Sequence, residues 1–576
     1  MSRSRLFTVA GAAALGYASV MAGKQPVSET RRDQMYPHLD AQDIARLSRF
    51  GERRSFAAGE HLMRTGEVAA GLAFILSGTI DVRHGGDFSR RQSIVRHGPG
   101  NFLGELAQLS GRPSLVDAVA EEDVDAIVVP PRRLRDVLVQ EAELGERIMR
   151  ALILRRVGLL EAGQSGPILI GPLGSADMLR LENFLTRNGH PHRSLDSGSD
   201  PCAQTLQARF NIQPEHLPIV LCPGGQILHN PGEGELARCI GLVAPIDPDH
   251  IYDAVVIGAG PAGLAAAVYG ASEGLSTLVL DCRSFGGQAG ASSRIENYLG
   301  FPTGISGLAL MARAYNQAQK FGAEIAIPDE AVSLAPERDA DGLFRLHLAM
   351  GETVRARAVV LASGARYRRL DIANLSDFEG TCVHYWASRV ETRLCAGQDV
   401  VLVGAGNSAG QAVVYLAGQA KRIWMVVRGG SLEATMSQYL IDRIRGLANV
   451  EVLLRTELCA LEGEGPLLGT VRWRSRDTGA VEARPAAHLF SFIGAAPNTD
   501  WLAGAGVKLD DKGFVITGAD GRHPLETCRD GIFAVGDVRC GSVKRVAAAV
   551  GEGSTVVSAL HAWLARQRAA LAEAAE

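Results

Sequence analysis

Two glycine-rich motifs in the second half of the chain have the residue types and spacing needed to bind a dinucleotide. They are Gly258-Ala259-Gly260-Pro261-Ala262-Gly263 and Gly404-Ala405-Gly406-Asn407-Ser408-Ala409. Glycines at these spacings allow a tight turn and let backbone N–H groups approach a pyrophosphate at a helix N-terminus. One such motif could hold many ligands. Two in this order, followed by Gly536-Asp537, indicate a flavin that receives hydride from a nicotinamide.

The elements of a βαβ unit surround the first motif. Tyr252–Ile257 predicts a buried strand, Ala262–Glu273 a helix and Leu278–Asp281 the next strand. Asp281 stands roughly 20 residues beyond the motif, where a carboxylate can hold an adenosine ribose. Strand, motif, helix, strand and acid in this order predict a Rossmann-type domain.

Three further stretches extend the pattern: Gly286-Gly287-Gln288-Ala289, Ile295–Pro302 and Ala362-Ser363-Gly364-Ala365. With them, the chain from about Asp253 to Ala562 resembles the low-molecular-weight thioredoxin reductases, a family of flavoproteins. The resemblance implies that Gln288 and Asn297 line the isoalloxazine of FAD. The residues assigned to FAD are Gly258, Gly260, Pro261, Ala262, Gly263, Asp281, Gly287, Gln288, Asn297, Ala362, Gly364, Gly536, Asp537, Arg545, Val546 and Ala547.

The second motif predicts an inserted nicotinamide-binding domain over residues 371–496. The strand predicted over Ile423–Val427 ends at Arg428, and an arginine there can pair with the 2′-phosphate of NADPH. The resemblance implies further basic residues nearby, where this chain has Gly429 and Glu433. We therefore expect NADPH, with NADH as the alternative. The residues assigned to this cofactor are Gly404, Gly406, Asn407, Ser408, Ala409 and Arg428.

The Cys-x-x-Cys that thioredoxin reductases carry before the second motif is missing. Trp386 and Arg389 stand at the two cysteine positions, and neither can form a nucleophilic thiolate. Dithiol relay at this place is excluded, so the acceptor is left open: a small redox protein, a quinone or oxygen. Cys382 and Cys395 flank the stretch without pair spacing. No catalytic residue is assigned; Tyr385 and Trp386 are candidates to lie near the flavin or, equally, core aromatics.

Residues 35–161 alternate apolar side chains between glycine turns, as in Leu72–Val82, and Pro131–Glu161 predicts helix. The same segment contains the run Phe102-Leu103-Gly104-Glu105-Leu106-Ala107. It resembles the cyclic-nucleotide-binding domain, a small β-roll with flanking helices, and this run matches the phosphate-binding cassette of that family.

The cassette departs from the family at its phosphate contact. Glu105 fits the role of holding the ribose hydroxyl, but the phosphate-binding arginine falls on Ser114, which cannot make a bidentate charged contact. Arg112 stands two residues early. The domain is either a nucleotide sensor or a scaffold that has lost its ligand, and we expect weak or no binding. The candidate site is Gly104, Glu105, Arg112 and Ser114.

Within residues 166–243, Met178–Asn188 predicts an amphipathic helix and Gly224-Gly225 predicts a hairpin turn. This segment resembles the thioredoxin/glutaredoxin fold, with Pro218 where that fold carries a cis-proline. The redox pair would follow the first strand, but Pro172–Asp177 contains no cysteine. We interpret this module as a docking or structural unit.

Composition, charge and cysteine usage are those of an ordinary globular protein. The 576 residues are 46% apolar and 21% charged with a net charge of −4, which favours neither nucleic acid nor a membrane surface as partner. Nine cysteines without a Cys-x-x-Cys predict reduced, buried thiols and neither a disulfide framework nor a metal site. Residues 1–34 are interpreted as a leader or tail, with export as the less favoured alternative because the run Leu6–Ala22 lacks a clear cleavage box. We expect a cytoplasmic homodimer.

The predicted fold is therefore multidomain: a β-roll, a small thioredoxin-like α/β module and two Rossmann-like three-layer domains. Residues 250–370 and 497–576 would form the FAD-binding domain. The favoured function is an FAD-dependent NAD(P)H oxidoreductase with a non-dithiol acceptor. The alternative is a regulatory flavoprotein that senses redox state and a cyclic nucleotide with little turnover. Membership of the thioredoxin-disulfide reductase class conflicts with the missing cysteines.

Overall fold

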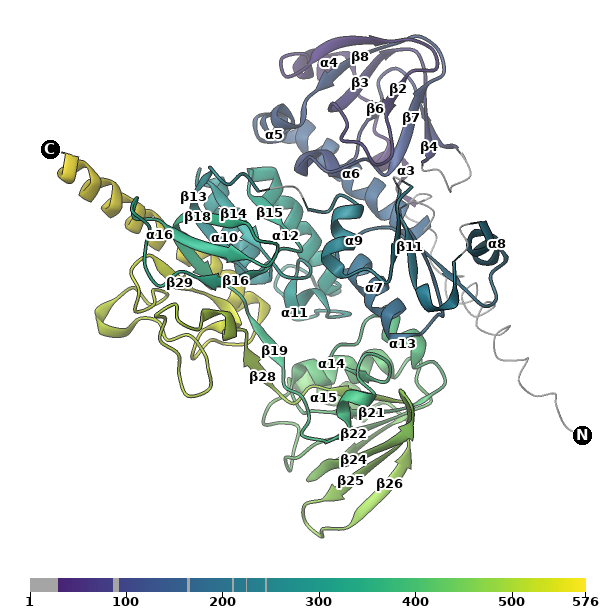
Figure 1. Cartoon of the computed structure of the whole chain (residues 1–576), viewed down its shortest axis with the longest axis vertical. Coiled ribbons are helices and arrows are strands. Elements are labelled where there is room, and N and C mark those ends of the chain that lie inside the picture. The colour runs from purple at the N-terminus through teal and green to yellow at the C-terminus, as the bar shows by residue number, and fades with distance from the viewer. Residues whose placement is uncertain are drawn as a thin grey trace, which may run out of the picture. The chain divides into compact units, whose positions relative to one another are not determined.

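The computed structural model describes residues 30–85, 93–162, 166–209, 212–223, 225–243 and 246–575. The predicted leader lies outside these residues up to position 29, as does Gly224 of the predicted hairpin turn. The chain divides into two compact units (Figure 1). Of the described residues, those up to 167 form the first unit together with the short segments around 191–193 and 223–225, and the others form the second.

The first unit is a β-roll of two antiparallel sheets with helices at its ends. The strand orders are β1-β8-β3-β6 and β2-β7-β4-β5, and Phe74 and Phe102 pack against Leu134 and Ile148 of the helices in one core. The predicted helical stretch is two helices that meet at Glu141. The elements are α3 (Arg32–Met35), α4 (Ala41–Leu47), β1 (Glu52–Phe56), β2 (His61–Met63), β3 (Leu72–Ser77), β4 (Ile80–His84), β5 (Ser93–His97), β6 (Phe102–Leu103), η1 (Leu106–Ser110), β7 (Val116–Ala120), β8 (Val124–Val129), α5 (Pro131–Gln140) and α6 (Ala142–Ala162).

The second unit begins with most of a small α/β module, residues 168–242, hereafter the small module; only the segments 191–193 and 223–225 of this range are grouped with the first unit. Its four strands have the order β10-β9-β11-β12, with β11 antiparallel to β9 and β12. The predicted amphipathic helix is α7, which begins after Ser175 and ends at Arg187, and the Leu217–Pro218 bond is cis. The elements are β9 (Ile168–Gly171), α7 (Ala176–Arg187), β10 (Arg193–Asp196), α8 (Pro201–Arg209), η2 (Pro214–His216), β11 (Ile219–Leu221), β12 (Ile227–His229) and α9 (Glu233–Cys239).

The prediction that all cysteines are reduced and buried is wrong in two respects: one pair is bridged, and Cys202 and Cys282 are exposed. Cys222, directly after β11, and Cys239, the last residue of α9, form a disulfide. Their Cα atoms are 6.3 Å apart although 17 positions separate them in the chain, a separation within the usual range for a bridge. The sequence pattern failed because the fold, and not a short spacing, brings these two residues together.

A seven-stranded mixed sheet, in which β17 is antiparallel to β16 and β18, carries the first glycine motif. Its order is β15-β14-β13-β18-β17-β16, with β29 also pairing with β18. Strands β13, β14, β15, β18 and β29 pair in parallel, which places their carboxyl ends at one edge. The elements are β13 (Ile251–Ile257), α10 (Pro261–Ser272), β14 (Thr277–Leu280), α11 (Gly287–Gly290), α12 (Gly307–Phe321), β15 (Glu324–Ala326), β16 (Ala331–Leu334), β17 (Phe344–Leu348), β18 (Thr353–Leu361), η4 (Asp500–Leu502), η5 (Ala519–Gly521), β29 (Ile532–Ala534), η6 (Gly536–Val538) and α16 (Val546–Ala575).

A five-stranded parallel sheet carries the second motif in the order β20-β27-β21-β22-β23. The short antiparallel pair β19–β28 lies where the chain passes from the sheet with the first glycine motif to the sheet with the second motif and back. The elements are β19 (Ala365–Tyr367), η3 (Leu375–Asp377), β20 (Val383–His384), α13 (Arg389–Leu394), β21 (Asp399–Val403), α14 (Asn407–Leu416), β22 (Arg422–Val426), α15 (Gln438–Arg445), β23 (Val450–Leu453), β24 (Thr456–Glu464), β25 (Leu467–Ser475), β26 (Val481–Pro485), β27 (His488–Ser491) and β28 (Ala495–Pro497). No helix among the described residues is both long and apolar enough to cross a membrane.

Candidate active site

The first glycine motif forms a cradle at the N-terminus of α10. A Cβ at Gly258 would lie 2.2 Å from the carbonyl oxygen of Ala362, and one at Gly263 would lie 1.9 Å from that of Gly258, so both positions require glycine. A Cβ at Gly260 would meet only the Cα of Gly287, at 4.0 Å. Gly260 caps α10 without a side-chain hydrogen bond. The cradle therefore offers both the room and the helix N-terminus that a diphosphate needs.

Asp281 follows β14 and faces this cradle. Its Oδ2 accepts the amide of Ala259 at 2.9 Å, and its Oδ1 accepts the amides of Arg283 at 3.0 Å and Ser284 at 3.2 Å. Burial raises the pKa of this carboxyl. A carboxylate fixed in this way at the carboxyl end of the strand fits the hydroxyls of a ribose.

Two further loops close on the cradle. Ser363 Oγ donates to Asn498 O at 2.8 Å and Asn498 Nδ2 donates back to Ser363 O at 2.9 Å, which fixes the turn from Ala362 to Gly364. A Cβ at Gly536 would lie 2.9 Å from the Cβ of Ala262, so the Gly536 loop packs directly on α10.

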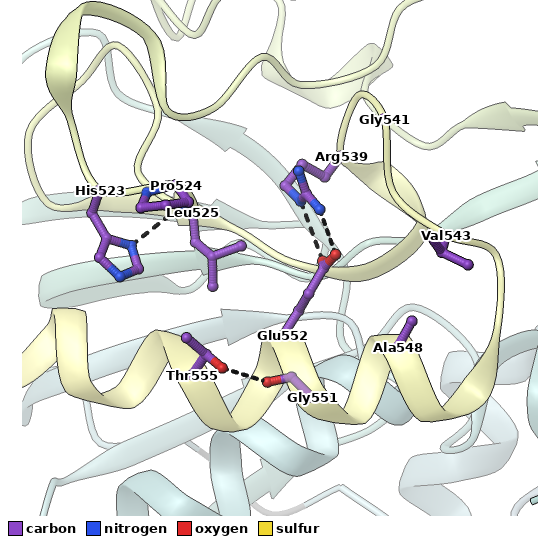
Figure 2. A pocket seen from close by; sticks show the side chains of 10 residues that line it. All are labelled: His523, Pro524, Leu525, Arg539, Gly541, Val543, Ala548, Gly551, Glu552 and Thr555. Carbon is purple, nitrogen blue, oxygen red and sulfur yellow. Dashed lines mark hydrogen bonds and ion pairs between the residues drawn. The ribbon is translucent and has the colours of Figure 1, made fainter.

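Glu552 of α16 holds the Gly536 loop in place, a role that the sequence did not reveal. Its Oε2 accepts the amide of Gly536 at 2.7 Å and an Arg539 Nε hydrogen bond at 3.3 Å. Figure 2 shows the Arg539–Glu552 pair. Burial raises the pKa of Asp537, and Lys544 Nζ donates to its backbone oxygen at 2.6 Å.

A cavity of about 340 Å³ is lined in part by this ion pair and by other residues of α16. None of its lining residues belongs to the set assigned to FAD. They are His523, Pro524, Leu525, Arg539, Gly541, Val543, Ala548, Gly551, Glu552 and Thr555.

Some of the residues assigned to FAD make no hydrogen bond of their own to the first cradle in the described part of the chain. Gln288 Nε2 donates to the carbonyl of Ala365, at the start of β19. Asn297, Arg545 and Ala547 are exposed. Their assignment to FAD stays a prediction.

The second cradle lies at the N-terminus of α14. A Cβ at Gly404 would lie 2.6 Å from Phe492 O, whereas one at Gly406 would meet nothing within 4 Å. Asn407 Oδ1 accepts the amide of Ser437 at 2.7 Å. Tyr367, on β19, hydrogen-bonds with Ser408, and burial raises the pKa of its phenol. The phenol therefore lies against the second motif.

Two arginines distant in sequence join Arg428 at the end of β22. The amide of Arg455 donates to Gly429 O at 2.9 Å, and the amide of Arg476 donates to Arg455 O at 2.8 Å. Arg476 Nη1 also donates to Arg428 O at 3.5 Å. Glu433 is paired with Arg445 at 2.6 Å. These contacts bring Arg428, Arg455 and Arg476 together, hereafter the basic edge, a grouping that the local sequence did not suggest. Arg455 is paired with Asp477 at 3.1 Å and Arg476 with Glu457 at 3.7 Å.

Trp386, at the first cysteine position of the family pattern, has specific partners in the structure. Its Nε1 donates to Glu391 Oε1 at 3.0 Å. The guanidinium groups of Arg187 and Arg283 lie 5.8 and 5.7 Å from the centre of its ring. Tyr385 packs in the core of the five-stranded parallel sheet and donates to Glu379. Trp386 thus contacts the small module, whereas Tyr385 has the surroundings of a core aromatic.

Neither flanking cysteine has the surroundings of a reactive thiol. Cys382 and Cys395 are both buried. Burial raises the pKa of Cys382, and burial together with Glu391 raises that of Cys395 to about 12. Both thiols stay protonated at neutral pH, so neither supplies a thiolate.

The cassette of the first unit is closed on itself. Ser114 Oγ donates to Glu105 Oε1 at 2.8 Å, and the amide of Leu115 donates to the same carboxylate at 3.2 Å. Glu105 and Ser114 are 7% and 3% exposed. The Glu105 carboxyl group, which would hold a ribose, is therefore hydrogen-bonded to Ser114, the residue at the position of the phosphate-binding arginine.

Comparison with known proteins agrees with this geometry. The family model for pyridine nucleotide-disulphide oxidoreductases matches residues 252–553, and that for the cyclic nucleotide-binding domain matches residues 53–141. Thioredoxin reductase of Mycolicibacterium smegmatis is 33% identical over 323 residues, which is 55% of this chain and 98% of that protein. The F component of alkyl hydroperoxide reductase from Escherichia coli is 30% identical over 319 residues. Those residues are 55% of this chain but span only 59% of that protein.

Solved structures give the same assignment. The thioredoxin reductase of T. acidophilum is 27% identical with a TM-score of 0.51, over 55% of this chain and 99% of its own. Lactococcus lactis thioredoxin reductase in its FR conformation is 25% identical with the same score and coverage. The chain therefore belongs to the pyridine nucleotide-disulphide oxidoreductase family, as a thioredoxin-reductase-like, FAD-containing NAD(P)H oxidoreductase with an N-terminal cyclic nucleotide-binding domain.

Proposed function

We propose that the chain transfers hydride from NAD(P)H to FAD and passes the electrons to an acceptor without a dithiol relay. FAD supplies the electron-carrying chemistry when bound. The first cradle with Asp281 would hold its diphosphate and ribose, and the second cradle would hold the nicotinamide dinucleotide. NADPH is the expected donor because the basic edge suits a 2′-phosphate.

The observation that carries this proposal is Trp386. Both cradles are built to receive a dinucleotide, yet the position of the redox cysteine is an indole bound to Glu391 and covered by Arg187. The relatives named as thioredoxin reductases and as a bifunctional thioredoxin reductase/thioredoxin suggest a small redox protein as partner. A quinone and oxygen remain as acceptors that need no thiol.

We also propose that the small module is a thioredoxin-like unit without its redox pair. Its four-stranded sheet with Pro218 directly before β11 supports this. The domain boundaries given by the sequence, 35–161, 166–243, 250–370 with 497–576, and 371–496, are proposed unchanged, as are a homodimeric assembly and a place in the cytoplasm.

The test is anaerobic stopped flow on the intact, FAD-loaded protein. NADPH should bleach the flavin absorbance, and one of a quinone, oxygen or a small redox protein should reoxidise it over many turnovers. Reduction that occurs once and finds no acceptor would contradict the proposal. It would favour the regulatory flavoprotein instead.

A further inference from the structure

The last residue of α7 reaches from the small module to the first cradle. Arg187 Nη2 donates to Gly287 O at 3.4 Å. A Cβ at Gly287 would lie 3.2 Å from the Cα of Gly260, the glycine that faces open space at the N-terminus of α10. The guanidinium therefore lies beside the loop that borders the space for the diphosphate.

Arg187 has no ion-pair partner among the residues that the structure describes, although burial lowers its pKa. The nearby Arg283 is paired with Glu233 at 2.9 Å. Asp281 accepts the amides of Ala259, Arg283 and Ser284 and makes no ion pair with Arg187. Asp281 and Glu233 favour the charged guanidinium only through space, and burial with the charge of Arg283 still lowers the pKa of Arg187. An anion in direct contact would therefore stabilise this cation.

The indole ring of Trp386 lies against one side of the Arg187 guanidinium. Arg187 lies over the Trp386 ring, and Asn183, one turn earlier on α7, donates to Glu391 at 3.3 Å. Asn188 Nδ2 donates to Arg283 O at 3.0 Å. The end of α7 is thus anchored on both nucleotide-binding parts, which leaves the guanidinium little freedom to turn away from the cradle.

We propose that Arg187 binds the diphosphate of FAD, so that the small module supplies part of the flavin site. The diphosphate would lie between two positive groups, the N-terminus of α10 and the guanidinium, and arginine suits the paired oxygens of a phosphate. This inference rests on the proposed position of FAD in the first cradle. It gives the small module a role in cofactor binding that needs no cysteine.

The experiment compares Arg187→Gln with Arg180→Gln in the full-length apoprotein. Arg180 lies on the same helix and binds Pro231 O and Asn230 within the small module, so it is a matched control. FAD is titrated by quenching of its fluorescence, and ADP and adenosine by competition. Loss of one charge-assisted contact should weaken FAD and ADP roughly 10- to 100-fold in Arg187→Gln, with adenosine and the Arg180→Gln variant unchanged.

Two results would overturn the inference. Arg187→Gln could bind FAD and ADP as tightly as the parent protein, or it could lose ADP and adenosine equally, which would indicate a distorted cradle. The ratio of the ADP affinity to the adenosine affinity within one variant is independent of the fraction of protein that is folded. A parent apoprotein that binds no FAD at all would instead remove the proposed function on which the inference rests.

Discussion

Trp386 and Glu391 are joined by a 3.0 Å hydrogen bond from the indole Nε1 to Oε1 of the carboxylate. The same carboxylate accepts Asn183 Nδ2 at 3.3 Å and the amide of Ser388 at 2.9 Å. The place that carries a redox cysteine in the thioredoxin reductases is thus used here to bind the small module.

We predict that the reduced protein shows only background disulfide reduction. The route from flavin to a disulfide substrate needs a thiolate that can form the mixed disulfide. Trp386, at the first cysteine position, has no thiol. NADPH-dependent reduction of thioredoxin and of an aromatic disulfide should be measured beside the rate of flavin reduction.

The controls for this prediction are two double variants, Cys382→Ser with Cys395→Ser, and Cys222→Ser with Cys239→Ser. Rapid disulfide reduction by the parent protein that disappears in either variant would reveal a relocated redox pair. Background rates in all three, with fast flavin reduction, agree with a different acceptor.

Gly260→Val should give a folded but colourless protein. A Cβ at this position meets only Gly287 Cα at 4.0 Å, so the polypeptide tolerates it, but the valine methyls would fill the space for the diphosphate. Overpacking of this kind should weaken FAD binding by roughly 10- to 100-fold or more. The measurement is the flavin content after purification and the FAD affinity of the apoprotein.

Gly263→Ala provides the contrast. Its Cβ would lie 1.9 Å from Gly258 O, so the fold itself should lose about 1–3 kcal/mol in its free energy of unfolding. Equal thermal stability of both variants would show that the two glycines do not have these separate roles.

NADPH should reduce the flavin faster than NADH. A charged contact to a 2′-phosphate contributes about 1.5–3 kcal/mol, on the order of 10- to 100-fold in preference. Arg428→Ala should remove most of this ratio, and Arg455→Ala should lower it less, because it removes a second guanidinium of the basic edge, one that is paired with Asp477 at 3.1 Å. Arg484→Ala is the control, since Arg484 pairs with Glu482 on β26. Equal rates with both nucleotides in the parent protein would contradict a phosphate site.

Local patterns predicted most of the fold, and long-range contacts account for what they missed. The strand before Gly258, the helix after it and Asp281 at the carboxyl end of the next strand follow from short spacings, because a βαβ unit is local. The cassette was also recognised, including its altered position at Ser114.

The residues that sequence reasoning missed act across large separations in the chain. Cys222 and Cys239 meet because β11 and α9 pack together, and Arg476 reaches Arg428 from the turn after β25. Glu552 holds the amide of Gly536 from α16, and Arg187 contacts Gly287 100 positions away. No periodicity or motif encodes such pairs.

Cyclic AMP and cyclic GMP should bind weakly or not at all. Ser114 Oγ donates to Glu105 at 2.8 Å, so the glutamate that binds the ribose in this family is already hydrogen-bonded within the protein. A serine also offers no positive charge to the phosphate. Isothermal titration of the full chain with each nucleotide tests this. Micromolar affinity would show that Arg112 supplies the missing contact and that the domain is a working sensor.

The buried Glu105 should make stability fall as pH rises. Burial raises its pKa above the ordinary 4.5, although the Ser114 hydrogen bond and the charge of Arg156 lower it in part. The folded chain therefore keeps a proton that the unfolded chain has released, so the free energy of unfolding decreases as pH rises above about 4.5. Glu105→Gln imitates the protonated acid and keeps an acceptor for Ser114. Its unfolding midpoint relative to the parent should increase as pH rises above about 4.5, and Glu122→Gln, at an exposed glutamate, is the control for the substitution itself. A constant difference for Glu105→Gln would mean that this carboxyl titrates at its ordinary value.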